Sequence, residues 1–211
     1  MEDKKKIICF DANGTIIDED TWAMFGDNKE EIDDALADYG DKKISIAELW
    51  DKMTQIFRST GMATADFIYE YWRNNCNLKN GAEDLIDYLK KKGYKIYLIS
   101  CSIEPCLKSI TEALSLDGFF AGSHLVFDAN GELERIESEC SDKLFKEKKI
   151  KELAKTENVD VREIIFVGDG YNDIGAFEAT GKGIAINSDI SDLLAISWKQ
   201  VRELSEIKDI L

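Results

Sequence analysis

The stretch IICFDANGT, residues 7–15, decides how this chain folds. Its apolar run followed by an aspartate predicts a short buried strand that ends in a tight turn, with the carboxylate of Asp11 presented at the strand's end. Residues 164–173, IIFVGDGYND, repeat the pattern far downstream and carry Asp169 and Asp173. Because ligands of open α/β sheets collect at the carboxyl ends of the strands, we expect these acids to meet there and hold a divalent cation.

The composition fits one domain, or a core with a smaller insertion: 211 residues, 44% of them apolar. The formal net charge of −15, from 27 basic and 42 acidic residues, argues against a surface for nucleic acid or anionic membrane. No apolar run approaches the roughly 20 residues of a membrane-spanning helix, and the Lys-rich start leads directly into the first strand. We therefore expect a cytoplasmic protein that binds a small molecule, and the oligomeric state stays open.

The cysteine and histidine content excludes several kinds of site. The five cysteines include no Cys-x-x-Cys pair and have no histidine cluster beside them, so we expect reduced thiols and neither a zinc site nor a disulfide framework. The single histidine, His124, would have to fill every histidine role alone, which argues against a Ser-His-Asp triad or a His-ligated metal. Among these kinds of site, the sequence therefore favours one that is built from carboxylates.

The segment after the first strand is expected to be helical. Apolar residues at helical spacing predict helices over residues 30–39, 46–58 and 63–74, and Ser45 begins a capping-box pattern for the second of them. An all-helical block of this length exceeds an ordinary crossover, so we expect residues 16–80 to form a cap.

From residue 81 the pattern changes to alternating helices and strands. A helix over residues 81–92, closed by Gly93, precedes a strand over 95–100, and Pro105 suits the first turn of the next helix. The later elements are expected to be a β-hairpin flap with strands 124–127 and 132–136 around an Asn-Gly turn, a helix over about 142–156, a strand over 164–167, a helix after Asp173, a strand over 183–186 and a final helix.

Together these elements predict an α/β fold, a Rossmann-like parallel sheet with helices on both faces, a hairpin flap and an inserted helical cap. The core would comprise residues 1–15 and 81–211, and the cap residues 16–80.

Four spaced motifs resemble those of the haloacid dehalogenase-like superfamily. The first, Asp-x-Asp-Gly-Thr in that family, reads DANGT here from Asp11; the second, a Ser or Thr ending a strand, is Ser100; the fourth is complete as residues 168–173, GDGYND. The third, a helical lysine, best matches Lys146. Other lysines crowd that stretch and stay open as alternatives: Lys143, Lys148 and Lys149. The helical cap and the hairpin resemble the phosphoserine phosphatase-like branch.

This resemblance implies a Mg²⁺-dependent phosphatase in which Asp11 attacks phosphorus and forms an aspartyl phosphate. Mg²⁺ would be held by Asp11, the backbone carbonyl of Asn13, Asp169 and Asp173, while Lys146 offsets the remaining charge. The residues expected to contact the phosphorylated substrate are Gly14, Thr15, Ser100, Cys101 and Asn172, with Asp20 in the cap.

Asn13 departs from the family pattern, which has a second aspartate there. In the family that residue protonates the leaving group and then activates water, and an amide can do neither. We therefore expect a preserved site with turnover reduced by roughly 10²–10⁴-fold, the loss of a general acid/base.

The substrate is less constrained. The cap arginine that binds the serine carboxylate in phosphoserine phosphatases has no clear match, because Met53 falls near its place, so phosphoserine is not our first choice. Acidic residues and tryptophans in the cap would suit a cationic or aromatic leaving group: Asp18, Glu19, Asp20, Trp22, Trp50 and Trp72.

Two rival functions remain open. One is a phosphotransferase or mutase of the same superfamily, which passes the phosphoryl group from Asp11 to an acceptor. The other is a catalytically inactive protein that binds a phosphorylated ligand. Dehalogenation is disfavoured, because it needs no cation site.

Overall fold

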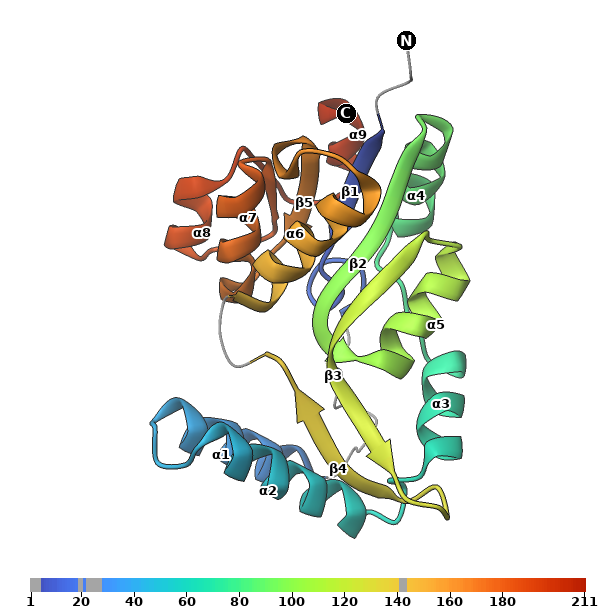
Figure 1. Ribbon diagram of the computed structural model, residues 1–211, viewed down its shortest axis with the longest axis vertical. Coiled ribbons are helices and arrows are strands. Elements are labelled where there is room, and N and C mark those ends of the chain that lie inside the picture. The colour runs from blue at the N-terminus through green and yellow to red at the C-terminus, as the bar shows by residue number, and fades with distance from the viewer. Residues whose placement is uncertain (1–4, 19–20, 22–27, 141–143) are drawn as a thin grey trace.

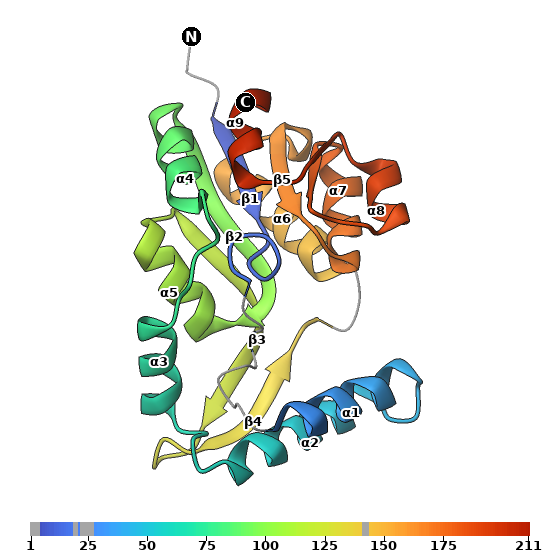
Figure 2. The ribbon, with the colours of Figure 1, turned by 180° about the vertical axis from the view of Figure 1, so that it is seen from behind.

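A seven-stranded sheet runs through the centre of the described part of the chain, residues 5–18, 21, 28–140 and 144–211 of the computed structural model. The strand order is β4-β3-β2-β1-β5-β6-β7, and all neighbours are parallel except β3 and β4 (Figures 1 and 2). The strands are β1 (Lys6–Phe10), β2 (Tyr94–Ile103), β3 (Gly118–Phe127), β4 (Leu133–Ser138), β5 (Ile164–Gly168), β6 (Gly183–Ile186) and β7 (Lys199–Val201). The predicted α/β class, with a Rossmann-like and mostly parallel sheet, is confirmed.

Helices cover both faces of this sheet. The helices are α1 (Lys29–Gly40), α2 (Ile46–Ser59), α3 (Ala65–Asn74), α4 (Ala82–Lys91), α5 (Glu104–Leu114), α6 (Leu144–Glu157), α7 (Ile174–Thr180), α8 (Ser191–Ile196) and α9 (Ile207–Ile210). Figure 1 shows α4 and α5 on one side of the central strands and α6 and α7 on the other. None of the helices in the described residues combines the length and the apolar character needed to cross a membrane.

The period of two along β1 explains this two-sided burial. Ile8 and Phe10 join the buried cluster that contains the apolar faces of α4 and α5. Ile7 and Cys9 point the other way, into the cluster formed with α6 and α7. Each fully buried aliphatic side chain contributes about 1.5–3 kcal/mol, so a central strand buried on both faces is a main source of stability.

Three predicted helix-terminal signals are confirmed. The side chain of Ser45 accepts the N–H of Glu48, and the Glu48 carboxylate accepts the N–H of Ser45, which completes the capping box of α2. Gly93 follows α4 with a φ of +79°, a left-handed conformation that favours glycine. Pro105 lies in the first turn of α5.

Two strand predictions and one helix prediction need correction. β2 continues to Ile103 rather than ending at Ser100, and its register with β3 shifts between those two residues. The predicted hairpin is real but is no separate flap, because β3 begins at Gly118 and its first half pairs in parallel with β2. The expected final helix is divided, since β7 pairs with β6 before the short α9.

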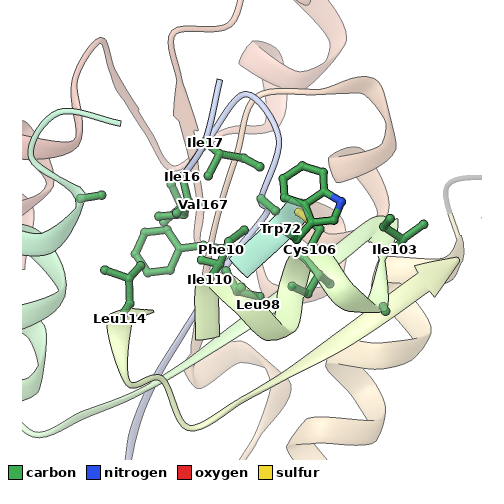
Figure 3. Close-up of a cluster of buried hydrophobic side chains, with 14 of the residues drawn as sticks. Phe10, Ile16, Ile17, Trp72, Leu98, Ile103, Cys106, Ile110, Leu114 and Val167 are labelled. Carbon is green, nitrogen blue, oxygen red and sulfur yellow. The ribbon is translucent and has the colours of Figure 1, made fainter. Parts of the chain in front are cut away.

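The segment 16–80 contains the predicted helices α1, α2 and α3. α2 packs against β4, whereas α3 packs against α5. Trp72 of α3 is 1% exposed and lies in one buried cluster with Cys106 and Ile103 (Figure 3). The division into core and cap at residues 15 and 80 stays a prediction.

The expectation of five reduced thiols was wrong for two of them. Cys101 and Cys140 form a disulfide, with Cα atoms 5.8 Å apart, while Cys9, Cys76 and Cys106 remain thiols. The two partners are 39 residues apart in the sequence. They meet because β3 turns back through β4, which returns the chain to the end of β2.

Candidate active site

The register of the sheet brings the predicted acids to one edge. Phe10 of β1 is paired with Val167 of β5, and the N–H of Asp11 donates to the Val167 carbonyl at 2.9 Å. Asp11 and Asp169 therefore leave adjacent parallel strands at the same level. Carboxylate oxygens of Asp11, Asp169 and Asp173 all lie within 4.8 Å of one another.

Lys146 lies between two of these acids. Its ammonium group is 2.9 Å from Asp11 Oδ2 and 2.5 Å from Asp173 Oδ1, and it donates to Asn172 Oδ1 at 3.2 Å. The Lys146 side chain is 1% exposed. On the same helix, Lys148 is exposed and Lys149 is paired with Glu139 and Glu152. Among the described lysines of that stretch, the site therefore contains Lys146; Lys143 lies outside the described residues.

Burial and charge oppose each other in this cluster. Burial raises the pKa of Asp173 to about 7, with the Asp11 charge acting in the same direction and Lys146 against it. Burial alone would lower the pKa of Lys146, but Asp11 and Asp173 outweigh it and the net pKa is raised. The lysine is therefore held as a cation between the two carboxyl groups.

The turn of the fourth motif holds Asp173 firmly. Its Oδ2 accepts the N–H groups of Asp169 and Gly170 at 3.0 and 2.9 Å, while Oδ1 faces Lys146. A Cβ at Gly168 would lie 2.3 Å from this carboxylate, so a side chain there would displace it. Both Asp173 oxygens thus already have protein partners.

Asp169 is held by the loop after Asp11. The hydroxyl of Thr15 donates to Asp169 Oδ1 at 2.8 Å. Gly14 has a φ of +76°, and a Cβ on it would lie 2.1 Å from Asp169 Oδ2. The N–H of Gly14 donates to the Ile17 carbonyl at 2.8 Å. Gly14 and Thr15 thus shape the loop around Asp169, and the Gly14 N–H is hydrogen-bonded within that loop; a contact of either residue with a substrate stays a prediction.

Asn13 belongs to a small polar network that the sequence did not reveal. The hydroxyl of Thr21 donates to Asn13 Oδ1 at 3.1 Å and lies 2.7 Å from the hydroxyl of Ser102. Thr21 and Ser102 are 5% and 3% exposed. No sequence signal marked either residue, because serine and threonine are common and the two are 81 residues apart.

Ser100 and Cys101 are found at the irregular end of β2. Pairing of Phe10 with Leu98 puts Ser100 near the level of Asp11 on the neighbouring strand. Ser100 is buried, and its hydroxyl accepts the N–H of Ser102 at 3.3 Å. The Cys101 sulfur is bonded to Cys140, so a substrate could meet only the backbone of Cys101.

Of the cap residues proposed for the leaving group, the three that the structure describes differ in their surroundings. Asp18 is 79% exposed and pairs with Lys79 at 2.9 Å, while Trp72 is buried in the core. Trp50 is half-buried. Glu19, Asp20 and Trp22 lie outside the described residues.

The donors fit Mg²⁺. Three carboxylates gathered around one point supply the oxygen ligands that this cation prefers. Burial is the main cause that raises the pKa of Asp169, and the negative charge of Asp11 raises it further. A cation bound nearby would offset the repulsion between these carboxylates. Asp11 and Asp169 are the carboxylates that would hold it, together with the backbone carbonyl of Asn13 that the family resemblance implies, whereas both oxygens of Asp173 already contact protein groups.

This fold and cluster define a Rossmann-like α/β protein with a carboxylate-based site at the carboxyl edge of its sheet. The chain belongs to the haloacid dehalogenase-like hydrolases, whose family model matches residues 5–181.

Individual relatives place it in the phosphoserine phosphatase-like branch. The phosphoserine phosphatase of Methanocaldococcus jannaschii is 28% identical over 189 residues, covering 88% of this chain and 87% of the relative. That of Lactococcus lactis is 27% identical over 198 residues, covering 92% and 89%. A substrate-bound phosphoserine phosphatase structure superposes with a TM-score of 0.77 at 24% identity over the whole of both chains, a likeness of fold.

Proposed function

We propose that this chain is a Mg²⁺-dependent phosphatase of small phosphorylated metabolites that works through an aspartyl phosphate on Asp11, with turnover limited by Asn13. The observation that carries the proposal is the placement of Lys146 between Asp11 and Asp173, with Asp169 in the same cluster. Family membership and relatives named phosphoserine phosphatases support the same reaction class.

Asp11 is the proposed nucleophile. Its Oδ1 accepts the N–H of Ala12 at 2.8 Å and its Oδ2 faces Lys146, so the carboxylate is fixed in orientation. One carboxylate oxygen attacks phosphorus, the bond from phosphorus to the leaving oxygen breaks, and an acyl phosphate results. Lys146 compensates the negative charge of this step from a site with little water. When bound, Mg²⁺ supplies the remaining charge neutralisation.

Asn13 limits both halves of the reaction. The leaving oxygen needs a proton, and the water that later attacks the aspartyl phosphate needs to lose one. An amide neither gives nor takes a proton at neutral pH, and Thr21 further fixes the Asn13 carboxamide by donating to its oxygen. We expect slow turnover with an intact site.

The substrate is proposed to be a small phosphomonoester other than phosphoserine. Met53 is fully buried, whereas the cap arginines Arg58 and Arg73 are exposed. A carboxylate on the substrate would therefore lack the buried bidentate partner that such groups need.

The test measures Mg²⁺-dependent phosphate release from an aryl phosphate by the chain and by Asn13→Asp, with Asp11→Asn as the blank. We expect Asn13→Asp to be faster by roughly 10²–10⁴-fold. No gain over the blank in either form, together with tight binding of a phosphorylated ligand, would replace the proposal with a binding protein. Product formation only when an acceptor is added would replace it with a phosphotransferase.

A further inference from the structure

Lys79 lies in the connection between α3 and α4 and reaches back to the loop after Asp11. Its ammonium group donates to the Gly14 carbonyl at 2.5 Å and pairs with Asp18 Oδ1 at 2.9 Å. The Lys79 side chain is 19% exposed, against 79% for Asp18. An ion pair with so exposed a carboxylate contributes little, so the contact with the Gly14 carbonyl is the more significant one.

Backbone contacts join the same two segments. The N–H of Lys79 donates to the Ile16 carbonyl at 2.8 Å, and Leu78 forms an isolated antiparallel bridge with Ile17. Residues 78 and 79 therefore hold the loop of residues 14–18 by both backbone and side-chain contacts, and the Lys79 side chain makes the contact with Gly14.

This loop determines where Asp169 lies. Thr15 donates to one Asp169 oxygen, and Gly14 packs so closely against the other that no side chain fits there. A shift of the loop would therefore move or release the Asp169 carboxylate. Lys79 also lies near enough to Asp169 for their charges to interact.

We propose that Lys79 is a positioning residue for the metal site: by holding the Gly14 carbonyl, it keeps the loop of residues 14–18 in the shape that orients Asp169. The inference rests on the proposed function, because it takes the carboxylate cluster to be a Mg²⁺ site. It gives a role to Lys79, which lies between α3 and α4 and belongs to none of the four motifs.

A positioning role and a purely electrostatic role of Lys79 predict opposite changes in Mg²⁺ affinity when the lysine is replaced. A cation beside the cluster repels Mg²⁺, so a purely electrostatic role predicts tighter Mg²⁺ binding in Lys79→Met. A positioning role predicts weaker binding, by about tenfold, as for other residues that orient metal ligands. The sign of the change therefore separates the two.

The experiment titrates Mg²⁺ into the chain by calorimetry and compares Lys79→Met with Lys79→Arg. The arginine variant keeps a donor for the Gly14 carbonyl and is expected to recover most of the lost affinity. Lys52→Met is the matched control, since it removes an exposed lysine that pairs with Asp38 away from the acids. Asp169→Asn is the blank. Should Lys79→Met fail to fold, Lys79→Gln replaces it with the same expectation.

Hydrogen exchange supplies a readout that needs no metal. The N–H of Gly14 is expected to exchange faster in Lys79→Met than in the unchanged chain or in Lys52→Met, because its bond to the Ile17 carbonyl loosens. Equal exchange, or equal or tighter Mg²⁺ binding, in Lys79→Met would overturn the inference and leave the metal site standing. If the unchanged chain binds Mg²⁺ no better than Asp169→Asn, the proposed metal site itself fails, and the inference with it.

Discussion

The ammonium group of Lys146 lies 2.9 Å from Asp11 Oδ2, and both side chains are almost wholly buried. Two carboxylates and one ammonium group share this interior, because Asp173 is held by the same lysine. Burying these charges is tolerable only while each has its partner. The site is consequently a place where single substitutions have large effects.

Lys146→Met is expected to destabilise the protein by about 3–5 kcal/mol at neutral pH, because it leaves Asp11 and Asp173 buried without their cation. Urea unfolding followed by circular dichroism measures this change. Lys148→Met, on the exposed side of the same helix, is the control and should change stability by less than about 0.5 kcal/mol. Similar losses in the two variants would contradict the pairing described for Lys146.

Gly14→Ala is expected to weaken Mg²⁺ binding, since the new Cβ would overlap the Asp169 carboxylate. Gly61→Ala separates this contact from backbone strain: Gly61 also has a positive φ, +70°, but a Cβ there would meet nothing within 4 Å. Both variants should lose about 1–2 kcal/mol of stability from the left-handed conformation. Calorimetric titration with Mg²⁺ should then show a loss of affinity in Gly14→Ala and none in Gly61→Ala.

Glu157→Gln is expected to cost about 1–3 kcal/mol of stability. Lys95 and Tyr97 hydrogen-bond the Glu157 carboxylate and hold its pKa at about 2, below its ordinary value near 4.5. A lowered pKa means that this contribution is complete above about pH 4.5 and is lost as the pH falls toward 2. Unfolding measured across acid pH should therefore show a smaller decline in the variant. Equal declines would contradict the assignment.

Reduction of the Cys101–Cys140 disulfide is expected to lower stability by about 3–4 kcal/mol, the loop-closure entropy of a cross-link spanning 39 residues. The unfolded, unreduced protein should titrate with three thiols, and the reduced protein with all five cysteines. Cys101→Ser should match the reduced form in thermal unfolding without reductant. Five thiols before reduction would show that the bridge does not form in solution.

The sequence alone predicted the parts of this protein that local physics controls. The continuous burial of β1, the capping box at Ser45 and the end of α4 at Gly93 each depend on a few neighbouring residues. The two acid-bearing turns were predictable for the same reason, since glycine and aspartate beside an apolar run favour them. The parallel order of the sheet followed from the alternation of helices and strands.

The tertiary structure decided which distant residues meet. The orientation of α6 on the sheet decides that Lys146, and not Lys148, faces the acids. The spacing of apolar residues along a helix does not determine this, because Asp173 lies 27 residues further along the chain. The Cys101–Cys140 bridge depends on the return of β4, and the contact of Lys79 with Gly14 joins residues 65 positions apart. Such contacts arise when whole elements pack, and packing reflects the complete set of buried surfaces rather than any short pattern along the chain.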